Sequence, residues 1–134
     1  MPQELGETTG PGDAAITHEG DGSASAGDAL AIDQSSGQLS PTNSGDTGGS
    51  EEFAGIASEE FGAAGENENL RTHAPTGVIA NVASGIAAGD RLGPSATAGE
   101  LGSSAGGPVL ALSDEGGTSS TGDSLAAGTA EVTF

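Results

Sequence analysis

Short apolar or alternating segments recur along most of the chain, and each is bounded by Gly, Pro, Asn, Asp or Ser. Segments of this length with turn residues between them are typical of β-strands, and their spacing favours an all-β sandwich or barrel with Gly-rich turns. The predicted strands cover Ala29–Asp33, Glu52–Ser58, Asn69–His73, Gly77–Ala83, Pro108–Ser113 and Ala130–Phe134.

A helix competes with strands in two places. Residues 59–69 are interrupted by Gly62 and Gly65, each of which costs a helix about 1 kcal/mol relative to Ala. Residues 78–88 contain Gly85 and several β-branched residues, which favour a strand followed by a turn. We therefore expect strands rather than helices throughout.

One stretch occurs twice. Residues 26–39 read AGDALAIDQSSGQL, and residues 88–101, 62 positions later, read AGDRLGPSATAGEL. In each copy we expect Gly-Asp to form a capped turn, the next Leu to point inward, and a later Gly to turn the chain back to a second inward Leu. Each copy is then a turn–strand–turn–strand cassette, with Leu30 and Leu39 in the first and Leu92 and Leu101 in the second.

Two cassettes facing each other would close one small barrel and leave few open edges. A further parallel follows each copy, where residues 56–59 read IASE and residues 111–114 read ALSD. The alternative is chance similarity in a chain rich in Gly, Ala and Asp. The first 22 residues lack clear periodicity and form an extended N-terminal arm in this interpretation, with a short strand at 14–18, whereas residues 23–134 form a single β domain.

The composition is strongly acidic and poor in large apolar residues. Twenty Asp and Glu face only Arg71 and Arg91, no Lys is present, and the net charge is −18. Leu, Ile, Val and Phe make up 21 of 134 residues, which on its own is typical of a disordered chain. The absence of Lys favours instead a folded protein of a hypersaline cytoplasm, where molar salt shortens the screening length to about 3 Å and strengthens apolar burial.

Several functional classes lack the residues they need. Two arginines give no positive footprint for nucleic acid, the apolar run at 78–88 is too short to span a membrane, and no Cys is present. No signal-peptide pattern opens the chain, so we expect a soluble protein made in a cytoplasm.

No catalytic or metal-binding constellation emerges either. Residues 102–106 match G-x-S-x-G around Ser104, but an apolar strand follows where that motif needs a helix. His18 and His73 are isolated, and the carboxylate pairs fit a hydrated acidic surface better than a Ca²⁺ or Mg²⁺ site. We predict no catalytic residue, no metal and no cofactor.

Five short segments follow one another along the chain: Gly55-Ile56-Ala57, Ala63-Ala64-Gly65-Glu66, Leu70-Arg71, Gly77-Val78 and Ile86-Ala87-Ala88-Gly89-Asp90. Their order resembles that of the small capsid-decoration (cement) proteins of tailed viruses. The resemblance covers about residues 25–134. It implies a compact β-barrel-like domain on the outer capsid surface, often a homotrimer, that braces neighbouring major capsid protein subunits. The acidic, Lys-free surface indicates a virus of halophilic archaea, so the expected location is the virion after synthesis in the host cytoplasm.

Docking in molar salt would rest on apolar and backbone contacts, because charge steering is screened. The arginines are expected to pair with carboxylates within the subunit or across an interface. The predicted interface residues are Leu5, Ile16, Phe53, Phe61, Arg71 and Arg91.

Two alternatives remain at this stage. The chain could be a cell-surface or ion- or carbohydrate-binding β module of a halophile, although its 2% aromatic residues offer little for stacking sugars. It could also be a small hydrolase acting through Ser104.

Overall fold

A computed structural model of the chain describes residues 5–6, 15–33, 36–42, 53–58, 65–71 and 77–134. Every regular element in these residues is a β-strand, which confirms the all-β fold class. Each predicted strand region in the described residues contains a strand. The strands are β1 (Ala15–Glu19), β2 (Ala29–Ile32), β3 (Leu39–Pro41), β4 (Phe53–Ala57), β5 (Asn67–Arg71), β6 (Val78–Asn81), β7 (Arg91–Pro94), β8 (Leu101–Ser103), β9 (Val109–Ala111) and β10 (Thr129–Thr133).

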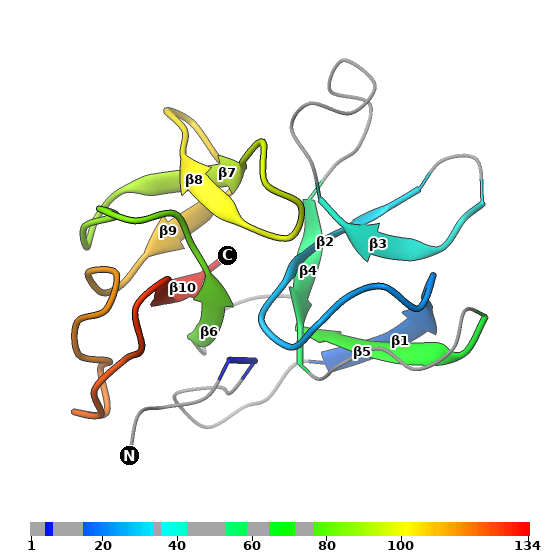
Figure 1. The fold of residues 1–134 in the computed structure, drawn as a ribbon, viewed down its shortest axis with the longest axis horizontal. Coiled ribbons are helices and arrows are strands. Elements are labelled where there is room, and N and C mark those ends of the chain that lie inside the picture. The colour runs from blue at the N-terminus through cyan, green and yellow to red at the C-terminus, as the bar shows by residue number, and fades with distance from the viewer. Residues whose placement is uncertain (1–4, 7–14, 34–35, 43–52, 59–64, 72–76) are drawn as a thin grey trace.

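The strands form two antiparallel sheets, one from each half of the chain, that lie side by side (Figure 1). Their orders are β1-β5-β4-β2-β3 and β6-β10-β9-β7-β8. We call residues 15–71 the N-terminal unit and residues 78–134 the C-terminal unit. Single parallel bridges from Gly20 to Leu39 and from Val82 to Leu101 bring the two edges of each sheet together at one point. Each sheet therefore curls on itself without closing into a barrel.

The two units share both topology and register. Numbered from its own first strand, each sheet has the order 1-5-4-2-3. Leu30 lies opposite Pro41 between β2 and β3, and Leu92 lies opposite Ser103, 62 positions later, between β7 and β8. The pairing of β1 with β5 and of β6 with β10 repeats with the same offset. The described part of the chain is a tandem structural repeat, and the two copies of the sequence repeat occupy equivalent positions in the two units.

The Gly-Asp turn of each cassette is capped in the same way, as predicted. Oδ2 of Asp28 accepts a 2.8 Å hydrogen bond from the backbone N–H of Ser25. Oδ2 of Asp90 accepts the equivalent bond from Ala87 at 2.9 Å. Each Asp therefore satisfies a backbone donor of its own turn, which is the usual role of Asp in such loops.

The four cassette leucines are fully buried and form the centres of two cores. Leu30 and Leu39 belong to a small cluster in the N-terminal unit, with Ala24 and Ala57. Leu92 and Leu101 belong to a larger cluster that also takes in two residues of the N-terminal unit, namely Ala29 and Ile56. Burial of each leucine contributes roughly 1.5–3 kcal/mol, so mostly small residues suffice around them.

The structure corrects two predictions about how the cassettes combine. The cassettes do not close one barrel together, because each pairs with strands of its own unit. The parallel between residues 56–59 and 111–114 is out of register by one position. Ile56 pairs with Arg71, and its structural equivalent is Leu110, which pairs with Thr133.

The predicted arm contributes a strand to the N-terminal sheet. β1 falls within the first 22 residues and pairs along its whole length with β5. The short strand expected at 14–18 is therefore present, shifted by one residue. The sheet begins before residue 23, because β5 would otherwise lack a partner on that side.

Candidate functional site

The two units meet at a junction built mainly from backbone hydrogen bonds. Asn81 N–H donates to the carbonyl of Gly27 at 2.9 Å, and Ala29 N–H donates to the carbonyl of Gly99 at 2.8 Å. Gly99 N–H in turn donates to the carbonyl of Thr42 at 2.8 Å. The turn and strand β2 of the first cassette are thereby fixed against β6 and the β7–β8 hairpin.

A side-chain bond completes this junction. Nδ2 of Asn81 donates to Oδ1 of Asp28 at 2.6 Å. Partial burial raises the pKa of the Asp28 carboxyl above its ordinary value, although the hydrogen bonds from Ser25 and Asn81 lower it in part. Asp28 therefore caps its own turn with one oxygen and binds the neighbouring unit with the other.

Residues 5–6 and one aromatic pair add further contacts at the junction and between the units. Gly6 N–H donates to the carbonyl of Ile79 at 2.7 Å, and a Cβ on Gly27 would lie only 2.5 Å from Cδ2 of Leu5. The rings of Phe53 and Phe134, which come from different units, are 5.0 Å apart at 87°. This edge-to-face geometry is the one that aromatic pairs favour.

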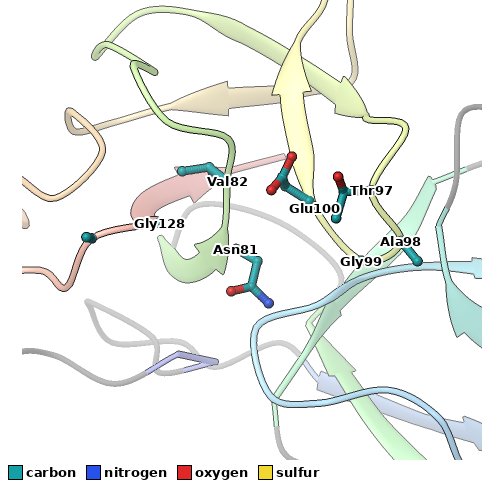
Figure 2. Close-up of a pocket in the computed structure, with 8 residues that line it drawn as sticks. Asn81, Val82, Thr97, Ala98, Gly99, Glu100 and Gly128 are labelled. Atoms are coloured by element: carbon teal, nitrogen blue, oxygen red, sulfur yellow. The ribbon is translucent and has the colours of Figure 1, made fainter.

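A shallow pocket of about 290 Å³ opens beside the junction on the C-terminal unit (Figure 2). The pocket walls come from the end of β6, from the β7–β8 turn and from the segment before β10. Its lining residues are Asn81, Val82, Thr97, Ala98, Gly99, Glu100, Ala127 and Gly128. This volume lies at the lower end of the range for small-molecule sites.

The polar groups of the pocket are largely committed to the fold. Glu100 accepts a 3.0 Å bond from the hydroxyl of Ser95, and Thr97 N–H donates to the same hydroxyl oxygen at 3.1 Å. Asn81 donates to Asp28, as described above. These bonds hold the β7–β8 turn in shape.

Two further carboxylates hold the long β9–β10 connection. The Glu131 side chain is buried on β10. Its Oε1 accepts a 2.8 Å hydrogen bond from the Ser120 N–H, and its Oε2 accepts a 2.6 Å bond from the Ser120 hydroxyl. Glu115 accepts backbone N–H groups of Gly128 at 2.7 Å and Gly85 at 3.2 Å, and these bonds lower the pKa of its carboxyl. Both groups have a structural role, because hydrogen-bonded carboxylates satisfy backbone donors of the loop.

The predicted interface residues do not gather at one place. Phe53 is half-buried against Phe134, and Leu5 packs on Gly27 at the junction, so both lie in contacts within the chain. Arg91 begins β7 and is exposed.

Of the others, Ile16 lies on β1 and Arg71 on β5, at neighbouring register positions of the N-terminal sheet. Phe61 lies outside the described residues. The interface role of all six stays a prediction.

Ser104 and His18, for which the sequence offers no catalytic or metal-binding partner, lie in a turn and on an exposed strand. Ser104 follows β8 in a turn, its N–H donates to the carbonyl of Arg91, and the chain then continues into β9 rather than a helix. His18 is exposed, with Nε2 2.9 Å from the carbonyl oxygen of Gly37, and His73 lies outside the described residues. Where the structure describes side chains, no three His, Cys, Asp or Glu residues lie close enough together to hold a metal ion.

Sequence reasoning expected Gly99 only as a turn residue of the second cassette and gave Asn81 no role, although both residues hold the junction. One signal was available, since Asn81 is the only amide within the apolar run at residues 78–83. A polar side chain inside a buried segment usually has a hydrogen-bond partner. Its partner, Asp28, could not be identified because it lies 53 positions away.

Comparisons with protein-family models, with curated proteins and with solved structures found no match. In the ranges given above, the structure contains no helix long and apolar enough to cross a membrane.

Proposed function

We propose that this chain is a structural virion protein that decorates the outer surface of a tailed-virus capsid. In this proposal it braces neighbouring major capsid protein subunits, has no enzymatic activity, and belongs to a virus of halophilic archaea. The basis is the resemblance of the order of its segments to the capsid-decoration proteins.

One observation carries the proposal. Two of the matching segments, at residues 55–57 and 86–90, take part in the same backbone hydrogen-bond pattern, one in each unit. Ala57, in the segment Gly55-Ile56-Ala57, accepts a hydrogen bond from Gly27 and donates one to Asp28. Gly89 and Asp90, in the segment at 86–90, make the same pair of bonds with Ala111. The matching segments therefore lie at equivalent turn and strand positions of the two units.

The junction suits a bracing role. The backbone bonds between the units hold the two sheets against each other, as a protein that braces its neighbours requires. The strongly acidic composition keeps the outer surface hydrated in concentrated salt, where apolar and backbone contacts would dominate docking. Homotrimers on the capsid remain part of the proposal.

Reconstitution tests the proposal. Shells of the major capsid protein that lack this chain are incubated with the purified protein in molar KCl and then sedimented. We expect saturable co-sedimentation at a fixed ratio to the capsid protein and greater resistance of the shells to heat. An unrelated protein of similar net charge serves as the control. Failure to bind, or binding equal to that of the control, would overturn the proposal.

A further inference from the structure

The junction joins the two units head to tail. A twofold arrangement would contain every contact twice, so that Asp90 would face Glu19 just as Asp28 faces Asn81. In the structure the carboxylate of Glu19 instead accepts a 2.9 Å bond from Nε2 of Gln38. Each unit therefore has two different faces. The junction joins one face of the N-terminal unit to the other kind of face of the C-terminal unit.

We name these faces by their residues. The turn face comprises Gly27–Ala29 in the N-terminal unit and its equivalent, Gly89–Arg91, in the C-terminal unit. The strand face comprises Asn81 and Gly99 in the C-terminal unit and their equivalents, Glu19 and Gly37, in the N-terminal unit. Among the described residues, the turn face at Gly89–Arg91 and the strand face at Glu19 and Gly37 make no contact with the other unit like that of the junction, and we call them the unused faces.

The unused faces are open where their counterparts are covered. A Cβ on Gly99 would lie 2.7 Å from Cγ of Asp28, whereas nothing lies within 4 Å of the same position on Gly37. Gly27 is covered by Leu5, whereas a Cβ on Gly89 would meet nothing within 4 Å. Ala29 is fully buried, and its equivalent Arg91 is exposed.

The charges on the unused faces compensate each other. Relative to the junction, the turn face gains a positive charge at Arg91 in place of Ala29, and the strand face gains a negative charge at Glu19 in place of Asn81. The junction residues Asp28, Ala29 and Asn81 together carry one net negative charge at neutral pH. Their equivalents Asp90, Arg91 and Glu19 carry the same net charge. A cation on one face and an added carboxylate on the other are what a contact between them requires.

We infer that the unused faces bind each other between two copies of this chain, turn face to strand face. By analogy with the junction, Glu19 N–H donates to the carbonyl of Gly89, and Arg91 N–H donates to the carbonyl of Gly37. That carbonyl lies 2.9 Å from His18 Nε2 and has a second lone pair. The Arg91 guanidinium lies between Asp90 of its own copy and Glu19 of the next. This contact is independent of the proposed capsid role.

Sedimentation of four proteins in molar KCl tests the inference. Wild type is expected to show a weight-average mass that rises with concentration up to about 1 mM, since small contacts are weak. Arg91→Glu should weaken association at least about tenfold, because three carboxylates then meet. The charge swap Glu19→Arg with Arg91→Glu should restore it, and Asp123→Asn, away from both faces, should behave as wild type. A wild type that stays monomeric, or a swap that does not restore association, overturns the inference.

Cross-linking provides a second test that is specific to the head-to-tail geometry. The chain contains no Cys, so Glu19→Cys and Asp90→Cys each introduce a single thiol. Under mild oxidation a mixture of the two variants should form disulfide-linked dimers of unlike chains, while either variant alone should form few. Equal yields in the mixture and in the separate samples would contradict the head-to-tail contact, and circular dichroism checks that both variants are folded.

Discussion

The amide of Asn81 and the carboxylate of Asp28, 53 positions apart in the chain, are joined by a hydrogen bond of 2.6 Å. The bond links a strand of the C-terminal unit to a capped turn of the N-terminal unit. Because Asp28 is partly buried, loss of its partner would leave a charge in the junction without this compensation.

Asn81→Ala should therefore destabilise the protein by about 1–3 kcal/mol, the usual cost of leaving a partly buried polar group without its partner. Denaturant unfolding in molar KCl measures the change. Asn67→Ala is the matched control, since Asn67 is an exposed residue of β5, and its effect should stay within about 0.5 kcal/mol. Equal effects of the two substitutions would show that the Asp28–Asn81 bond does not hold the units together.

The two equivalent glycines of the β2–β3 and β7–β8 hairpins allow a second comparison. Gly99 and Gly37 have φ of +79° and +74°, so Ala costs both about 1–2 kcal/mol in backbone strain. Only at Gly99 would the new Cβ meet Asp28, at 2.7 Å from Cγ. Gly99→Ala should thus lower the unfolding free energy more than Gly37→Ala does. The reverse order in denaturant unfolding would place the junction elsewhere.

Acid should affect Asp28 and Glu115 in opposite directions. Burial raises the folded-state pKa of Asp28 above its ordinary 3.8, so the folded protein binds this proton more tightly than the unfolded chain. Ionisation of Asp28 then destabilises the fold as the pH rises from 3.8 through the folded pKa. The unfolding free energy of wild type relative to Asp28→Asn should increase as the pH is lowered through this window.

Glu115 supplies the opposite sign. Backbone hydrogen bonds lower the folded-state pKa of its carboxyl below 4.5, so its stabilising contribution is complete above 4.5 and is lost as the pH falls through the folded pKa. Wild type relative to Glu115→Gln should therefore lose stability on acidification. Denaturant unfolding at several pH values measures both differences, and slopes of the same sign would contradict the assignment.

Salt should control whether the fold forms at all. With a net charge of −18 and few large apolar residues, we expect the chain to need charge screening and salting-out to stay compact. Circular dichroism should show β structure in molar KCl or NaCl and its loss on dialysis into dilute buffer. A spectrum unchanged by dialysis would contradict adaptation to high salt.

The strands and cassettes could be predicted from sequence because turn residues and inward leucines mark them locally. The pairing of strands could not, since it depends on contacts between distant segments. The misplaced parallel at residues 111–114 shows why. Leu112 is apolar and so looks like a core residue, but its side chain is 42% exposed. Ala111 is buried instead, because the backbone bond between Gly89 and Ala111 sets which residues of β9 face the core.

The junction was equally hidden from sequence reasoning. Asp28 and Asp90 occupy equivalent turns and cap them in the same way, yet among the described residues Asp28 alone of the two bonds to the other unit. That difference arises from the order of the units along the chain, which no local pattern encodes. The predicted interface residues were chosen for size and charge, and two of them, Leu5 and Phe53, make contacts within the chain.

The proposed role as a structural component of a virion can be tested on purified virions from a halophilic archaeal host. Quantitative mass spectrometry should find this chain at a near-stoichiometric ratio to the major capsid protein. Virions that contain the capsid protein without this chain would contradict it.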